Sequence, residues 1–137
     1  KKIPEIHIST DIIVGFPGET EEQFNDSLHL IKEIKPDTLN ISKFWPRPKT
    51  AAAKLEQVDV QVRNERSKKI KELYRKISKS QNEKWLNKEC EVYIDEVREN
   101  KILGRNNSYK QVVLNEGNLG EKVNVEIKEA GINFLKS

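Results

Sequence analysis

Asp11 and Ile13 stand two residues apart, just before the run Gly15-Phe16-Pro17-Gly18, and their types suit contact with a nucleoside. In a strand, residues of the same parity share one face. A carboxylate there can accept hydrogen bonds from ribose hydroxyls, and an isoleucine can pack on an adenine ring. Backbone N–H groups near the turn can help to hold the same ligand. The run also fits an ordinary connection between a strand and a helix, without any ligand.

A second cluster of polar and aromatic residues lies late in the chain. Its two cations suit phosphate contacts, its two asparagines can hydrogen-bond sugars or base edges, and its tyrosine offers a ring for stacking. The five candidates for contacts with RNA are Arg105, Asn106, Asn107, Tyr109 and Lys110. Taken alone, the same run is also typical of a polar hairpin loop.

The first cluster is expected to lie in a strand, a turn and a helix, followed by a second strand. Residues 7–14 alternate, the glycine-rich run has the residue order of a type II turn, and Thr20-Glu21-Glu22-Gln23 has the spacing of a capping box. Apolar spacing then predicts a helix that Pro36 ends, and residues 38–44 return to alternation. Such a β–α–β unit is expected to be parallel and right-handed.

One face of this unit is unusually polar, and it carries Asp11, Ile13, Asn40 and Ser42. In a parallel barrel the outward face packs on helices, and the inward face lines the active site at the carboxyl ends of the strands. Two strands cannot close a barrel and would leave edges exposed. We therefore expect further barrel strands upstream, so that the sequence is cut at its N-terminus.

Residues 59–84 predict a long amphipathic helix with a basic surface. Its apolar face has helical spacing and consists of Ile70, Leu73, Tyr74 and Ile77. Residues 59–86 hold 9 Lys/Arg against 4 Asp/Glu, whereas the remaining residues hold 16 against 18. Arg66 and Lys69 are chosen from this surface as candidate RNA contacts. A solvated linker helix would carry the same residues.

After residue 88 the sequence changes to short alternating runs separated by turn residues. Five strands are predicted, at residues 89–97, 101–105, 109–114, 123–129 and 133–136. We expect them to form a small antiparallel OB-like barrel, because closure protects the edges that so few strands otherwise leave.

Composition excludes several classes of protein. Charged residues make up 34% and hydrophobic residues 35% of the 137 residues, which is typical of a soluble folded chain. No apolar run is long enough to cross a bilayer, so a cytoplasmic protein without a membrane partner is expected. A single cysteine, Cys90, excludes a disulfide framework or a cysteine-only iron–sulfur site within this chain. Trp45 and Trp85 are expected to be packing anchors, and His7 and His29 to have structural or solvent roles.

Two runs of the first segment carry a resemblance to a known family. They are Thr10-Asp11-Ile12-Ile13-Val14-Gly15-Phe16-Pro17-Gly18-Glu19-Thr20-Glu21-Glu22-Gln23-Phe24 and Trp45-Pro46-Arg47-Pro48-Lys49-Thr50-Ala51-Ala52. Both closely resemble the late barrel of radical-SAM tRNA methylthiotransferases. The Pro-Arg-Pro loop and Gln61-Val62 are most similar to the archaeal and eukaryotic branch that acts on threonylcarbamoyladenosine. Leu103-Gly104-Arg105-Asn106-Asn107-Ser108-Tyr109-Lys110-Gln111-Val112-Val113 resembles the signature of the TRAM domain, an RNA-binding barrel that ends these enzymes.

The resemblance implies an enzyme that adds a methylthio group to N6-threonylcarbamoyladenosine beside the anticodon, using S-adenosyl-L-methionine (SAM) and two 4Fe-4S clusters. The chain departs from the family because it lacks the CxxxCxxC triplet and the cysteines of the second cluster. It is therefore expected to hold no catalytic or metal-binding residue and to be inactive alone. The implied partners are the anticodon stem-loop of tRNA and a missing N-terminal cluster-binding region.

The implied fold class is α/β plus all-β, in three segments. Residues 1–58 would be the C-terminal part of a radical-SAM (β/α) barrel, residues 59–85 a basic linker helix, and residues 86–137 the TRAM RNA-binding domain. Arg47 and Lys49, in the loop beyond the second strand, would face the tRNA or the threonylcarbamoyl carboxylate.

The implied SAM contacts are Asp11, Ile13 and Gly15. Many radical-SAM enzymes place a Gly-x-Ile-x-Gly-x-x-Glu pattern against the adenine, and Ile13 and Gly15 fit it. Asp11 stands where the pattern has its first glycine, and Glu19 falls one residue late. Capping of the following helix is therefore the other role expected for Glu19.

Two other functions compete with the enzyme fragment. One is a stand-alone TRAM-type RNA-binding module without catalysis, in which the barrel remnant only stabilises the RNA-binding domain. A true start codon at this boundary would favour it, whereas an upstream CxxxCxxC would favour the enzyme. The other is an interaction module that does not bind RNA, and it predicts no salt-dependent RNA binding.

Overall fold

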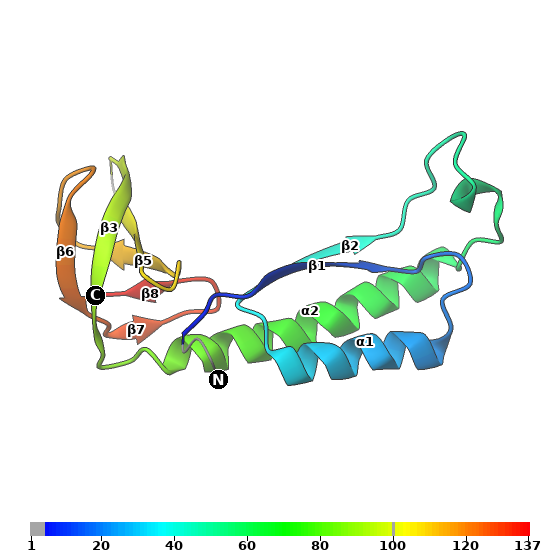
Figure 1. Ribbon diagram of the computed structural model, residues 1–137, viewed down its shortest axis with the longest axis horizontal. Helices are drawn as coiled ribbons and strands as arrows, with labels where there is room; N and C mark the ends of the chain where they lie inside the picture. The colour runs from blue at the N-terminus through cyan, green and yellow to red at the C-terminus, as the bar shows by residue number, and fades with distance from the viewer. Residues whose placement is uncertain (1–4, 100) are drawn as a thin grey trace. The chain divides into compact units, whose positions relative to one another are not determined.

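The computed structural model describes residues 5–99 and 101–137, and the chain divides into two compact units (Figure 1). The first unit is Ile8–Ile77, and the second is Ser78–Ser137 together with residues 5–7. Residues 1–4 of the predicted barrel segment lie outside the described part of the chain. Among the helices of the described residues, none combines the length and the apolarity that a membrane crossing requires.

The first unit holds two parallel strands joined by a helix, as predicted. Strand β1 (Ser9–Val14) pairs with β2 (Thr38–Lys43), and helix α1 (Glu21–Ile34) connects them. The predicted capping box also forms: the Thr20 side chain accepts from the Gln23 N–H, and the Gln23 side chain accepts from the Thr20 N–H. Both the parallel pairing and the start of the helix are therefore confirmed.

Helices α1 and α2 (Val60–Glu83) cover one face of this sheet (Figure 1). The buried core between the helices and the sheet consists of Val14, Phe24, Ile31, Leu39 and Ile70. The opposite face is open, and Asp11, Ile13 and Asn40 are exposed on it. The described residues give two strands to this sheet, so the radical-SAM barrel stays a prediction.

The described residues of the second unit form a curled mixed sheet of six strands in the order β6-β3-β4-β5-β8-β7 (Figure 1). The strands are β3 (Glu89–Arg98), β4 (Lys101–Asn106), β5 (Gln111–Leu114), β6 (Lys122–Glu126), β7 (Glu129–Ala130) and β8 (Leu135–Lys136). Neighbouring strands are antiparallel except for β5 and β8, which run parallel. The prediction of five antiparallel strands is therefore wrong in number and in the direction of one pair.

The predicted strand at residues 123–129 is two strands in the structure. Ile127 and Lys128 lie between them. The Ile127 side chain is fully buried in the core, and its N–H donates to the Lys88 carbonyl oxygen at 3.0 Å. Strand β7 then begins at Glu129 and pairs with β8. Alternation alone does not reveal where such a run is divided into two strands.

The core of the second unit is built from Val92, Ile94, Val112, Leu114, Ile127 and Leu135. Trp85 and Cys90 pack against this core, which confirms Trp85 as a packing anchor. Burial raises the pKa of the Cys90 thiol and so disfavours the reactive thiolate. Strand β4 approaches β3 closely at Gly104, where a Cβ would lie 2.5 Å from Val92 Cγ1. The glycine of the TRAM-like signature therefore has a packing reason.

Candidate functional site

Asp11 and Ile13 share the open face of the β1–β2 sheet, as the parity of the strand predicts. Asp11 lies opposite Asn40, whose side-chain amide donates to Asp11 Oδ1 at 2.7 Å. Ile13 lies opposite Ser42 and is 60% exposed. A carboxylate, an amide and an apolar side chain therefore gather near the carboxyl ends of two parallel strands, where such sheets bind ligands.

The turn after β1 is held by the carboxylate of Glu19. Gly15 has a φ of +74°, a conformation that favours glycine, and its N–H donates to Glu19 Oε2 at 2.7 Å. The Glu19 N–H donates to the Phe16 carbonyl oxygen at 2.9 Å. The side chain that was expected to cap the following helix therefore caps the turn.

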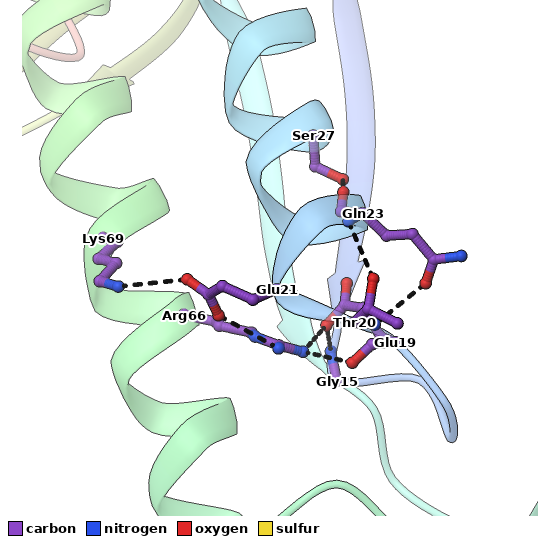
Figure 2. Close-up of polar contacts among 8 residues, drawn as sticks. All are labelled: Gly15, Glu19, Thr20, Glu21, Gln23, Ser27, Arg66 and Lys69. Atoms are coloured by element: carbon purple, nitrogen blue, oxygen red, sulfur yellow. Dashed lines mark hydrogen bonds and ion pairs between the residues drawn. The ribbon is translucent and has the colours of Figure 1, made fainter.

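Arg66 reaches from α2 to the same carboxylate (Figure 2). Its Nη1 lies 2.6 Å from Glu19 Oε2, and its Nη2 lies 3.3 Å from Glu21 Oε2. The guanidinium also lies over the Phe24 ring, 5.3 Å from the ring centroid. Because the side chain is only 6% exposed, its ion pairs leave no surface for a phosphate. We therefore remove Arg66 from the candidate RNA contacts and assign it to the fold of this unit.

The exposed cations of α2 lie elsewhere on the helix. Lys69 is 56% exposed, with its Nζ 3.7 Å from Glu21 Oε1, and it remains a candidate. Lys68, Lys71 and Arg75 are exposed and stand three and four residues apart, so they share one side of the helix. Sequence reasoning recognised the basic surface but did not choose these three residues from it.

The loop after β2 presents an aromatic ring and two cations. Trp45 is 79% exposed, so the prediction that it is a packing anchor is wrong for the described chain. Arg47 and Lys49 are exposed as well. The Arg47 carbonyl oxygen accepts from the Thr50 hydroxyl at 2.8 Å, which closes a turn before the short 3-10 helix η1 (Ala52–Lys54). The loop leaves the sheet at the carboxyl end of β2.

In the second unit, two of the five predicted RNA contacts are buried. Asn106 is 5% exposed, and its Oδ1 accepts from the N–H groups of Ser108 and Lys110 at 3.1 and 2.9 Å. It therefore builds the loop. Lys110 is 8% exposed, and its Nζ donates to Asn82 Oδ1 at 2.9 Å. Both side chains hold the loop in place.

The exposed part of this loop is centred on Tyr109, which is 62% exposed and has a φ of +56°. The Arg105 guanidinium lies over the Tyr109 ring, 4.5 Å from its centroid, while Arg105 Nε lies 2.8 Å from Asp95 Oδ2. The His7 ring meets Tyr109 edge-on at 6.0 Å. Together with the exposed Asn107, the residues Arg105, Tyr109 and His7 form what we call the Tyr109 surface.

His7 was not predicted to belong to this surface. Its Nδ1 lies 3.1 Å from the Ser108 carbonyl oxygen, although the two residues are 101 positions apart in the chain. No local pattern marks such a contact, because it depends on how the chain before β1 packs on the second unit. The alternation that extends the strand back to residue 7 argued against it.

Comparisons with known proteins identify relatives over nearly all of the chain. It is 44% identical over 132 residues to a probable threonylcarbamoyladenosine tRNA methylthiotransferase of Archaeoglobus fulgidus, covering 96% of this chain and 31% of the relative. It is 41% identical over 136 residues to the probable enzyme of that name from Pyrococcus abyssi, covering 98% and 32%. Identity to the human threonylcarbamoyladenosine tRNA methylthiotransferase is 36% over 138 residues, covering 99% and 24%.

These matches span a third or less of the length of each relative. No protein-family model matches the chain. The relatives come from archaea and from a eukaryote, as the Pro-Arg-Pro loop and its neighbours led us to expect. Over nearly all of its length the chain is thus similar to the C-terminal portion of threonylcarbamoyladenosine tRNA methylthiotransferases.

Proposed function

We propose that this chain is the C-terminal portion of an enzyme that adds a methylthio group to N6-threonylcarbamoyladenosine next to the tRNA anticodon. In this proposal the chain supplies contacts with SAM and with tRNA, and the 4Fe-4S clusters belong to an N-terminal region. The observation that carries the proposal is the exposure of Asp11 and Ile13 beside Asn40, on the open face of a sheet in a chain with these relatives. A cytoplasmic location is part of the same proposal, because the proposed substrate is tRNA.

The residues on the open face fit the nucleoside part of SAM. Asp11 is exposed, and Asn40 orients its carboxylate, which can accept hydrogen bonds from ribose hydroxyls. Ile13 gives an adenine ring an apolar surface. The Gly15 N–H already donates to Glu19, so Gly15 contributes the shape of the turn and not a donor. SAM, when bound, is the source of the radical.

Asp11→Ala is expected to weaken SAM binding by the longer, cluster-loaded protein about tenfold to a hundredfold. A hydrogen bond to a charged group contributes roughly 1.5–3 kcal/mol, and about 1.4 kcal/mol corresponds to a factor of ten in affinity. Equilibrium binding of SAM to the two proteins measures the change. Ser9→Ala, on the same exposed face of β1, is the matched control and should leave the affinity unchanged. Wild-type affinity in the Asp11 variant would show that Asp11 serves the sheet alone.

We assign tRNA binding to three surfaces of the described chain. The Tyr109 surface offers a ring for base stacking and a cation above it, and Asn107 adds polar groups for base edges. Lys68, Lys69, Lys71 and Arg75 of α2 suit a phosphate backbone. The loop with Trp45, Arg47 and Lys49 suits the modified base and its carboxylate.

Tyr109→Ala is expected to lower the affinity of this chain for an anticodon stem-loop that carries N6-threonylcarbamoyladenosine by about fivefold to a hundredfold. Loss of stacking on one base costs about 1–3 kcal/mol. Arg105→Ala should also reduce the salt dependence of binding, by about one unit of slope. Lys136→Ala is the charge-matched control for Arg105→Ala, because Lys136 of β8 pairs with Glu129 at 3.1 Å and lies outside the cross-strand row that holds Arg105. Fluorescence anisotropy at several salt concentrations measures both quantities.

Two outcomes of these experiments would change the proposal. If Tyr109→Ala and Lys136→Ala bind RNA equally well, the Tyr109 surface is not the RNA site. If the stem-loop binds as expected but the longer protein does not bind SAM, the function is that of an RNA-binding module without catalysis. Binding of neither ligand would leave a module for other partners.

A further inference from the structure

Two arginines of α2 contact the segments that follow both strands of the first unit. Arg66 Nη1 donates to Glu19 Oε2 at 2.6 Å and to the Glu19 carbonyl oxygen at 3.1 Å, at the end of the turn after β1. Arg63 Nη1 donates to the Phe44 carbonyl oxygen at 2.6 Å, one residue beyond β2. We call Arg63, Arg66 and Glu19 the arginine clamp.

Glu19 joins the clamp to the backbone of the turn. Its Oε2 accepts from the Gly15 N–H at 2.7 Å as well as from Arg66, and its side chain is 13% exposed. Figure 2 shows Arg66 extending from α2 past the start of α1 to this junction. Because little water reaches the junction, both hydrogen bonds are strong. The place of the Gly15 N–H is therefore set by α2 as well as by the turn itself.

Arg63 confines Gly15 from a second direction. A Cβ on Gly15 would lie 2.2 Å from Arg63 Cγ and 2.7 Å from Arg63 Cδ, so the stem of Arg63 lies directly against the glycine. The guanidinium at the end of the same stem holds Phe44. A single helix thereby fixes the turn after β1 and the exit of β2.

The arginine clamp adds little stability compared with apolar packing at the same place. Arg66 lies four residues before the fully buried Ile70, on the side of α2 that faces the core, where an apolar residue would also fit. A buried ion pair gains little over apolar packing, because its attraction is offset by the loss of water. Within the described residues, the Nε atoms of Arg63 and Arg66 are also buried without a hydrogen-bond partner. The ion pair between Arg66 and Glu19 is therefore better suited to fixing the geometry of the turn after β1 than to adding stability.

We propose that Arg66 is a positioning residue for the cofactor site. Through Glu19 it fixes Gly15, and with it the end of β1 that carries Asp11 and Ile13. Arg66 acts through another residue and does not itself touch the ligand in this proposal. That the ligand is SAM rests on the proposed function, whereas the mechanical link from Arg66 to Gly15 does not.

Amide hydrogen exchange in this chain tests the mechanical link without any ligand. Arg66→Met should accelerate exchange of the Gly15 N–H by about tenfold or more, because Glu19 loses the partner that orients it. Arg66→Lys, which keeps one charged donor, should give a smaller acceleration. Lys76→Met is the matched control on the same helix, since Lys76 is exposed and its loss should change Gly15 exchange by less than about twofold. Glu19→Gln is a second variant that tests the pair if Arg66→Met does not fold.

SAM binding by the longer, cluster-loaded protein tests the positioning role. Arg66→Met should weaken SAM binding by about tenfold, with partial recovery in Arg66→Lys, and Lys76→Met should bind like the wild type. Unchanged Gly15 exchange would overturn the clamp, whatever SAM does. Faster exchange with unchanged SAM affinity would overturn the positioning role and leave Arg66 structural. A wild-type protein that binds no SAM would overturn the proposed function and the positioning role together, while the exchange result on the clamp would stand.

Discussion

Replacing Arg66 with methionine is expected to lower the free energy of unfolding of the first unit by about 3–5 kcal/mol. Methionine keeps much of the apolar stem but removes the guanidinium, and the Glu19 carboxylate then stays buried with the Gly15 N–H as its remaining side-chain partner. A buried charge without a partner is costly. Removing one partner of a buried ion pair therefore lowers the free energy of unfolding by more than the intact pair contributes to it. Urea unfolding followed by far-ultraviolet circular dichroism, which α1 and α2 dominate, measures the change.

Two further variants separate the buried charge from other effects of the mutation. Lys69→Met removes an exposed partner of Glu21 from the same helix and should cost less than about 1 kcal/mol. The double variant Glu19→Gln/Arg66→Met removes both charges, so it should be more stable than Arg66→Met alone. If Arg66→Met were no less stable than Lys69→Met, the buried pair would not anchor the turn.

The fold of the first unit could be predicted because its signals are local. The strand alternation, the capping box and Pro36 each act within a few residues of where they stand, and the structure bears them out. Arg66 shows where this approach fails. It was chosen for its charge, although residues 66, 70, 73 and 77 share one side of the helix, which the structure buries. The position of Arg66 on the helix predicts its burial better than its residue type does.

The second unit was harder to predict because its organisation depends on contacts distant in sequence. Strand β8 pairs in parallel with β5, and a pairing of this kind leaves no mark on the alternation of either strand. The Arg105–Lys110 loop has a related ambiguity. The residue type does not distinguish an asparagine that closes a loop from one that hydrogen-bonds a base. Only the structure shows that Asn106 closes the loop.

Gly15→Ala is expected to destabilise the first unit by about 2–5 kcal/mol, for two separate reasons. An L residue in the left-handed region at φ +74° costs roughly 1–2 kcal/mol. The new Cβ would also lie 2.2 Å from Arg63 Cγ, and such overpacking costs about 1–3 kcal/mol more. Because Arg63 Cγ is near the backbone of α2, it cannot swing away as the tip of a long side chain would. The same urea unfolding experiment reports the loss.

Gly18→Ala is the control that isolates the contact with Arg63. Gly18 has a φ of +85° and nothing within 4 Å of the position that an added Cβ would take, so alanine there should cost only the conformational term of about 1–2 kcal/mol. The double variant Gly15→Ala/Arg63→Ala removes the clash and should therefore cost less than the sum of its two single substitutions. Equal losses for Gly15→Ala and Gly18→Ala would mean that α2 does not press on the turn. A larger loss of stability for Gly15→Ala than for Gly18→Ala would show that α2 shapes the end of β1, where the proposed cofactor contacts lie.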